Sequence, residues 1–411
     1  MSNNTKTVYL VSGSRHTVPP NKKSPGVPRI IETLSLGDST AYNYKVISKY
    51  DASLEGQNYD KSKYLHIKPT FWNRSFEKFL HYVPQRIKKR IFGYSLNDRI
   101  VYYEGIKRLI KKEKPDVVIT FMHFELFKKL CNSYPKAKHI YFFRSTDLKL
   151  RLGSENIDFL LKHSSGFLAN TQSPISELNT ISSDFKFPTA TIYNSINLND
   201  FSDKISEQLL IDYRNKLGLT KADFVLGYAG RLSEEKSILE LFEVIHDLNS
   251  KNIKVHLLIA GSIKNESTPN TSYYKKIMDF VTSHISTQVH FLGWLPNEKL
   301  YEFYNALDLG ILLSKYSEGN SMFLLESLSM KTPVIATSIG GNAEIITDGY
   351  NGFLINTKNV KQNLILKLET ILRDKTQLDE ISINALNYIK QHHTNGIMID
   401  KFNNFMKKLE N

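Results

Sequence analysis

The segment from Ser314 to Ala336 constrains the fold of this chain more than any other part of the sequence. It follows the apolar run Leu309–Leu313 and ends in a second apolar run, Pro333–Ala336, and both runs have the length of buried strands. A short loop with Gly319 and Asn320 lies between them, followed by an apolar stretch with helical spacing. The order strand, loop, helix, strand predicts part of an open parallel sheet.

Two glutamates, Glu318 and Glu326, stand on either side of the predicted start of this helix, which we place near Ser321 or Met322. The backbone N–H groups of Ser321, Met322 and Phe323 then have no partner within the helix and point towards any anion placed there. In an open parallel sheet, ligands bind at this carboxyl end of the strands. The segment therefore predicts a site for a ligand with a phosphate-sized anionic group.

Five blocks of the second half of the chain carry a family resemblance. In order they are GRLSEEK at Gly230–Lys236, LLIAGS at Leu257–Ser262, Val289–Ser314, the two glutamates at E-x7-E spacing followed by TPVIAT, and GGNAEIITDGYNGFLI at Gly340–Ile355. Together they resemble retaining glycosyltransferases of the GT-B fold, family 4, also called group 1 glycosyltransferases.

This resemblance implies an α/β fold of two Rossmann-like domains that face each other across a cleft, with a C-terminal helix crossing back to the first domain. The turn NSINLNDF, Asn194–Phe201, resembles the hinge block of the family. We therefore expect an acceptor-side domain at 1–200, a domain that binds the nucleotide sugar at 201–390, and the returning helix at 391–411.

The donor side needs fixed positive charge, because the diphosphate of a sugar nucleotide gains charge as the glycosidic bond breaks. Arg231 and Lys236 supply it, and Lys236 stands beside the positive end of a predicted helix, where a ligand would offset the repulsion. The resemblance implies that Glu326 binds the ribose hydroxyls and that Glu318 lies near the transferred sugar, with Gly230 and Asn320 also at the donor. Solvated surface charges are the structural alternative.

Candidates on the acceptor side come from the first half of the chain. Gly26 is the glycine that remains in the loop after the first strand, where the family commonly has a pair. His123 follows the predicted strand 115–123, and Arg144 follows the next strand, where relatives often carry a histidine. Arginine stays charged and cannot act as a base, so Arg144 departs from the family pattern. We count His123 and Arg144 as catalytic candidates, although a histidine at a strand end is commonly only a hydrogen-bonded residue.

The net charge of +13 is concentrated between Arg74 and Lys114, which hold 12 basic and 4 acidic residues. Seven aromatic residues are interspersed with these charges: Phe76, Phe79, Tyr82, Phe92, Tyr94, Tyr102 and Tyr103. On helices this composition favours contact with an anionic membrane surface. The alternative is an apolar stripe that faces the core, with a solvated basic back.

Metal and other cofactors are not expected, because there is no D-x-D motif and Cys131 and the twelve histidines lack the spacing of a zinc site. Phosphate-loop, dinucleotide and nucleophile-elbow motifs are also missing from the sequence. No apolar run approaches the length of a membrane span, and no secretory signal is visible. We expect a cytoplasmic protein, peripheral on the inner face of the membrane.

The predicted activity is transfer of a sugar from a nucleotide sugar, UDP-linked in our interpretation, to a lipid-linked or cell-surface glycan acceptor. No pair of carboxylates is set as nucleophile and acid, so we expect retention by displacement on the same face of the sugar. A sugar-nucleotide epimerase or a phosphorylase on the same fold is the alternative. A basic nucleic-acid-binding protein is more remote, since no nucleic-acid signature appears.

Overall fold

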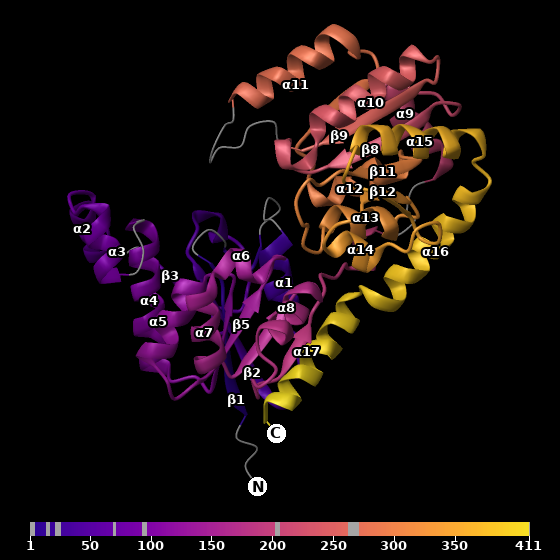
Figure 1. Cartoon of the computed structure of the whole chain (residues 1–411). Helices are drawn as coiled ribbons and strands as arrows, with labels where there is room; N and C mark the ends of the chain where they lie inside the picture. The colour runs from indigo at the N-terminus through magenta and orange to yellow at the C-terminus, as the bar shows by residue number, and fades with distance from the viewer. Residues whose placement is uncertain are drawn as a thin grey trace. The chain divides into compact units, whose positions relative to one another are not determined.

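The computed structural model describes residues 5–13, 17–20, 26–68, 71–92, 97–201, 206–261 and 271–410. The chain divides into two compact units, each built on one sheet (Figure 1). The first unit comprises Met1–Tyr193 together with Met398–Asn411, and the second comprises Asn194–Ile397. Among the described residues, no helix is long and apolar enough to cross a membrane.

The first unit contains a seven-stranded sheet with the order β3-β2-β1-β4-β5-β6-β7, in which every neighbouring pair is parallel. Its strands are β1 (Lys6–Val11), β2 (Tyr42–Lys49), β3 (Tyr64–Ile67), β4 (Val117–Phe121), β5 (Lys138–Phe143), β6 (Gly166–Ala169) and β7 (Thr189–Thr191). Helices cover both faces, so the strands are continuous apolar runs whose alternate residues enter different cores. In β1, Val8 and Leu10 enter one core, whereas Tyr9 and Val11 enter the other.

The helices of the first unit are α1 (Gly26–Leu34), α2 (Phe71–His81), α3 (Gln85–Phe92), α4 (Asn97–Glu113), α5 (Phe124–Ser133), α6 (Leu148–Leu152), α7 (Ser154–His163) and α8 (Ser173–Ile181). The C-terminal helix α17 (Asn395–Glu410) joins them, because Phe402, Phe405 and Met406 lie in the same core as Val8 and Leu10. The end of the chain is therefore part of the first unit's core, as the resemblance implies.

The second unit contains a six-stranded parallel sheet with the order β10-β9-β8-β11-β12-β13. Its strands are β8 (Phe224–Ala229), β9 (Val255–Ala260), β10 (Val289–Gly293), β11 (Leu309–Leu312), β12 (Val334–Thr337) and β13 (Phe353–Ile355). Its helices are α9 (Glu207–Lys216), α10 (Ile238–Ser250), α11 (Thr271–His284), α12 (Asn297–Asn305), α13 (Met322–Ser329), α14 (Gly341–Ile345), α15 (Val360–Arg373) and α16 (Gln377–His392), with a short 3-10 turn at Glu234–Lys236. One apolar core joins this sheet to its helices.

Local sequence signals placed most of these elements well. The strands β1 and β3 have the predicted bounds, and α13 begins at Met322 after Ser321 as expected. The helix predicted at 30–36 is wrong by a turn at its start: α1 begins at Gly26, because Pro28 fits the first turn of a helix. The helix α8 begins at Ser173, so the residue predicted as its cap is instead its first residue.

The basic segment 74–114 is divided between two environments. Tyr102 and Tyr103 of α4 are buried in a core of the first unit, so for these two aromatics the prediction of a lipid-facing role is wrong. Phe76, Phe79 and Tyr82 are exposed. The placement of Tyr94 and of the side chain of Phe92 lies outside the described residues.

Candidate active site

The second sheet reverses its strand order between β8 and β11, which lie side by side although the chain makes them far apart. The loop after β8 contains Gly230–Lys236, and the loop after β11 contains Ser314–Ser321. Both loops leave the carboxyl edge of the sheet at this switch point. A crevice for ligands forms at such a point in open α/β sheets, because the two loops run to opposite sides.

Lys236 and Glu318 meet at this switch point. The Lys236 ammonium forms an ion pair with Oε2 of Glu318 and lies 3.4 Å from Oγ of Ser314. The Ser314 hydroxyl donates a hydrogen bond of 2.7 Å to the same carboxylate oxygen. The side chains of Lys236 and Glu318 are 16% and 19% exposed, so the pair is shielded but still reachable from solvent. Oε1 of Glu318 has no partner among the described residues.

The backbone of Glu318 is held by a glycine turn that follows β12. Gly341 N–H donates to the carbonyl of Glu318 at 2.7 Å. Gly340 has a φ of +55°, and a Cβ at this position would lie 2.4 Å from the same carbonyl oxygen. Only glycine combines this backbone angle with so close an approach. The turn therefore fixes where Glu318 stands.

A second close approach involves the loops after β8 and β9. Gly230 N–H donates to the carbonyl of Ala260 at 2.9 Å, and Gly261 has a φ of +156°. A Cβ on Gly261 would lie 2.0 Å from the carbonyl oxygen of Gly230. Glycine at 261 thus lets the Gly230 loop pack tightly over the end of the sheet.

Arg231 belongs to the same loop as Lys236 but has a different partner. Its guanidinium pairs with Glu235 at 2.9 Å, and its side chain is 64% exposed. The structure therefore does not bring Arg231 into contact with Glu318. The buried hydroxyl of Tyr228 links the two electrostatically: burial raises its pKa, the charge of Glu318 raises it further, and Arg231 opposes both.

The N-terminus of α13 opens beside this network. Ser321 precedes the helix in an extended conformation and makes no side-chain cap, so its first N–H groups are not used by a capping side chain. Asn320 is only 5% exposed, and its side-chain amide has no hydrogen-bond partner among the described residues. A buried amide without a partner is costly, and a ligand would remove that cost. Met322 is half-buried, and the ring of Phe323 packs in the core.

Glu326 lies one helical turn further along α13 and faces the interior. It is 8% exposed, and its Oε2 accepts a hydrogen bond of 2.7 Å from the hydroxyl of Tyr304 on α12. Burial, followed by the charge of Glu326, raises the pKa of Tyr304 far above its usual value. The carboxylate thus has a structural partner in addition to the donor role that the resemblance implies.

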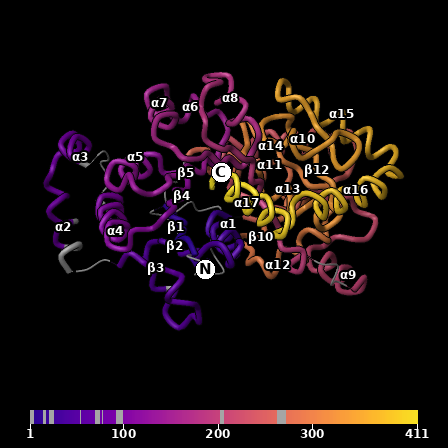
Figure 2. The backbone as a smooth tube through the Cα atoms, turned by 90° about the horizontal axis from the view of Figure 1, so that it is seen from below, coloured from indigo at the N-terminus to yellow at the C-terminus, as the bar shows by residue number. Residues whose placement is uncertain are grey.

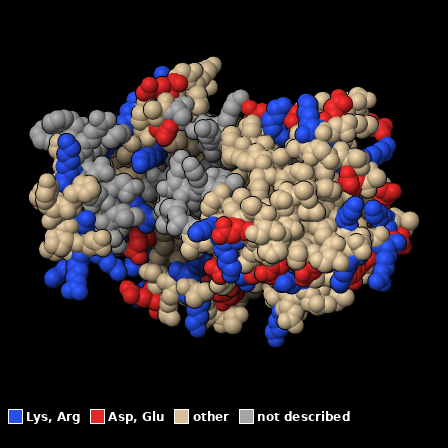
Figure 3. Space-filling view, turned by 90° about the horizontal axis from the view of Figure 1, so that it is seen from above, with Lys and Arg blue, Asp and Glu red and all other residues tan. Residues whose placement is uncertain are grey.

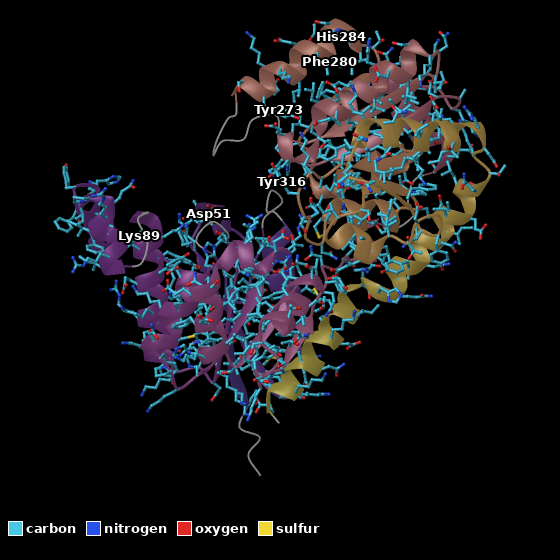
Figure 4. The ribbon with its side chains drawn as sticks, viewed as in Figure 1. Asp51, Lys89, Tyr273, Phe280, His284 and Tyr316 are labelled. Carbon is cyan, nitrogen blue, oxygen red and sulfur yellow. The ribbon has the colours of Figure 1, made fainter. Side chains whose placement is uncertain are left out.

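A cavity of about 340 Å³ lies next to this loop cluster in the second unit. Its lining includes Glu234, Lys315 and Tyr273, which flank the ion pair in sequence or lie on α11. The Tyr273 hydroxyl accepts a hydrogen bond from the N–H of Leu239 at 3.1 Å. Figure 4 shows Tyr273 and Tyr316 along the same side of the second unit.

The first unit has a switch point of its own, between β1 and β4, and His123 stands at it. His123 Nδ1 and the hydroxyl of Tyr103 share a hydrogen bond of 2.6 Å. On the other side, Gly13 lies so close to the ring that a Cβ there would be 2.0 Å from Nε2. His123 is therefore fixed between α4 and the loop after β1.

Arg144 and Gly26 complete the predicted set in the first unit. Arg144 follows β5 with its guanidinium carbon 5.4 Å from the ring centre of Phe142. Burial lowers the pKa of Arg144 to about 10, which leaves it charged at neutral pH. Gly26 is the first residue of α1.

Sequence reasoning missed several residues of these two switch points: Gly13, Gly261, Gly340, Ser314 and Tyr304. The three glycines each follow a strand, which is a signal that could have found them. The partnerships of Ser314 and Tyr304 depend on contacts between loops and helices, and no spacing in the sequence shows them. Within the described part of the chain, no group of three or more histidine, cysteine, aspartate or glutamate side chains could hold a metal ion.

Comparison with solved structures defines the class of fold. The chain is similar to Anabaena HepE in complex with UDP and glucose (TM-score 0.72, 16% identity) and to sucrose-phosphate synthase from Thermosynechococcus elongatus (TM-score 0.74, 15% identity). Each alignment covers 98% of this chain and 99% of the other. These two parallel Rossmann-like sheets are a GT-B fold.

Comparison of sequences then identifies the family. Residues 211–388 match the model of the family "Glycosyl transferases group 1", and the chain belongs to this family. It is similar to the capsular polysaccharide biosynthesis glycosyltransferase CapM of Staphylococcus aureus, with 24% identity over 47% of this chain and 49% of CapM. It is also similar to the lipopolysaccharide 1,2-N-acetylglucosaminetransferase of Salmonella typhimurium, with 27% identity over 39% of this chain and 42% of that enzyme. The chain spans about half the length of the curated relatives that it matches.

Proposed function

We propose that this protein transfers a sugar from a nucleotide sugar, with UDP as the nucleotide, to a glycan acceptor. The observation that carries the proposal is the contact of Lys236 with Glu318 and Ser314 at the switch point of the second sheet. A cation, a carboxylate and an unused helix N-terminus stand together there. This set matches a ligand that combines a diphosphate with sugar hydroxyls.

Lys236 stabilises the leaving group in this proposal. The diphosphate gains negative charge as the bond to the sugar breaks, and an ammonium already fixed at that point lowers the barrier without having to reorganise. The ion pair with Glu318 keeps the ammonium in place before the donor arrives. Arg231 is exposed on the same loop and is free to turn towards the phosphates once it leaves Glu235.

Glu318 holds the transferred sugar. Its Oε2 is occupied by Lys236 and Ser314, whereas Oε1 is available to accept a hydrogen bond from a sugar hydroxyl. The amide of Asn320 and the N–H groups of Ser321, Met322 and Phe323 bind the donor beside it, over the Gly230 loop. Glu326 binds the ribose hydroxyls with the oxygen that Tyr304 does not use.

Catalysis proceeds with retention in this proposal: the leaving phosphate takes the proton of the acceptor hydroxyl on the same face of the sugar. His123, Arg144 and Gly26 of the first unit serve the acceptor. Arg144 acts as a fixed charge and not as a base, because its pKa of about 10 keeps it protonated.

The choice of donor and acceptor is supported by the relatives. HepE was crystallised with UDP-glucose, and the CapM and Salmonella relatives are named for capsular polysaccharide and lipopolysaccharide synthesis. A lipid-linked or cell-surface glycan is therefore the acceptor that we propose, and the inner face of a membrane is the place of action.

Thermal denaturation with UDP, GDP, dTDP and their sugars tests the donor site. We expect UDP and a UDP-sugar to raise the Tm, since a ligand at about 100 times its Kd adds about 2.7 kcal/mol to stability. Incubation of the donor with and without acceptor separates the alternatives, because an epimerase reacts without acceptor and a phosphorylase needs inorganic phosphate. A chain that no nucleotide or sugar nucleotide stabilises would not have this function.

A further inference from the structure

The helices α2 and α3 form a hairpin, residues 71–92, at the outer end of the first unit. Figures 1 and 2 show it beyond α4 in both views. Its inner side packs on the unit: Leu80 is buried in the same core as Ile100 of α4, and Val83 is packed against that core. The apolar residues on its other side contribute to neither core. Four of these are more than 45% exposed: Phe79, Tyr82, Ile87 and Ile91.

The exposed residues of the hairpin follow an amphipathic pattern. On α3, Ile87 and Ile91 are four residues apart and form one stripe, and Arg86 and Arg90 form a second stripe directly beside it. Tyr82, in the turn before α3, is 87% exposed. The hairpin sequence has six lysine and arginine residues and a single acidic one. Basic and apolar side chains thus share one surface.

The space-filling view shows the same mixture. At the left end of Figure 3, where α2 and α3 lie, blue lysine and arginine side chains stand next to tan ones. Lys89 is exposed on α3 and is labelled in Figure 4. The alternative that the apolar stripe faces the core does not hold for this hairpin, because Leu80 and Val83 already fill that role.

We propose that this hairpin docks the protein on an anionic lipid surface, with Tyr82, Ile87 and Ile91 entering the interface and Arg86 and Arg90 lying among the headgroups. Charge complementarity identifies the occupant: an exposed apolar stripe flanked by arginines is stabilised by hydrocarbon and anionic headgroups together. A nucleic acid would engage the cations but gains nothing from isoleucines, which offer no ring for base stacking. The proposal rests on residues of the first unit and is independent of the donor chemistry.

Co-sedimentation of the full chain with vesicles tests this proposal. We expect binding to phosphatidylcholine vesicles that contain phosphatidylglycerol and no binding to phosphatidylcholine alone. The double variant Arg86→Gln with Arg90→Gln removes two cations and is expected to weaken binding about 20-fold. Ile87→Ser with Ile91→Ser is expected to weaken it at least about tenfold. Leu150→Ser on α6 and Lys111→Gln on α4 are the controls, because both residues are exposed outside the hairpin.

The stabilisation of each variant by nucleotide is measured alongside. Vesicle binding lost by the hairpin variants and kept by both controls, with an unchanged thermal shift, supports the proposal. Four results would overturn it: no binding of the unaltered chain to anionic vesicles, equal binding by hairpin variants, binding to RNA or duplex DNA in place of vesicles, or a dimer that the hairpin variants abolish. A missing thermal shift in every variant concerns the donor site alone.

Discussion

The ammonium of Lys236 and the carboxylate of Glu318 pair between two loops that leave β8 and β11 on opposite sides of a switch point. The two residues are 82 positions apart in the chain, and the parallel contact of the two strands brings them together. Ser314 supports the same carboxylate oxygen. The pair therefore acts as one unit, and each residue's contribution to activity is measurable against the other.

Replacement of Lys236 by alanine should lower donor turnover about 100- to 1,000-fold, the usual effect of losing one fixed group that stabilises developing charge. Hydrolysis or transfer of a UDP-sugar, read as kcat and KM, is the measurement. Lys251→Ala is the matched control, because Lys251 also pairs with a glutamate, Glu369, but lies on the surface. Equal turnover in both variants would remove Lys236 from the mechanism. In a double-mutant cycle with Glu318→Gln, we expect the two losses not to add.

Gly340 should tolerate no side chain. In Gly340→Ala, the new methyl group would meet the carbonyl oxygen of Glu318 at a backbone angle that alanine rarely adopts. We expect the free energy of unfolding to fall by about 2–4 kcal/mol and the turnover to fall with it. Gly349→Ala is the control: it has a φ of +74°, but nothing lies within 4 Å of the added Cβ, so only the cost of the backbone angle, about 1 kcal/mol, remains. Urea unfolding measures both, and similar losses would contradict the role of the contact.

Gly13 and His123 provide a test in the first unit. Gly13→Ala should push the imidazole away from its hydrogen bond with Tyr103, because the added Cβ would overlap Nε2. The expected loss of stability is about 1–3 kcal/mol. In the background of His123→Ala the space is open, and the same substitution should cost much less. Unfolding measurements on the four chains of this cycle decide it; equal costs in both backgrounds would mean that Gly13 is constrained by something other than the ring.

The strands were the most predictable elements, since a parallel strand buried on both faces is a continuous apolar run, as in β1 and β3. The fold followed from five blocks in one order along the second half of the chain. The contacts of Gly13 were not predictable: the glycine matters because a histidine from a strand more than 100 residues later packs on it. A single sequence gives the strand that precedes a glycine but not the side chain that will lie against it.

The hairpin shows a second limit of sequence patterns. Phe79 and Leu80 are neighbours with similar hydropathy, yet Leu80 is buried and Phe79 is exposed. Helical periodicity gives the angle between two side chains but not which of them faces the protein. The same ambiguity applies to Glu326: its spacing from Glu318 suggested a ligand, and only the packing of α12 against α13 reveals Tyr304 as a partner.

Glu326 can be tested for both of its roles. Glu326→Gln keeps an oxygen for the Tyr304 hydroxyl, so we expect the Tm to change little, while the loss of the second charged acceptor raises the KM for the donor about tenfold. Tyr304→Phe is the complementary variant: it removes the internal hydrogen bond, lowers stability by about 1 kcal/mol and should leave the KM close to that of the unaltered chain. If Glu326→Gln changes stability alone, the carboxylate is a structural residue and the proposed ribose contact is wrong.

Buried histidines should make the first unit less stable in acid. His139 is buried in β5 and its Nε2 lies 2.8 Å from the carbonyl of Tyr134. Burial lowers its pKa, and the hydrogen bond only partly opposes this. The unfolded chain therefore binds a proton at a higher pH than the folded chain does, so the stabilisation is complete above the unfolded pKa of about 6.5 and is lost as the pH falls towards the folded value. Burial lowers the pKa of His66 in the same unit, with the same sign.

The measurement is the urea midpoint between about pH 7.5 and about pH 5, which should fall with pH. His139→Gln keeps a side-chain N–H for Tyr134 and removes the titration, so this variant should lose less stability over the same range. His81→Gln is the control, because His81 is exposed at the end of α2. A pH dependence that is the same in all three chains would assign the acid sensitivity to other groups.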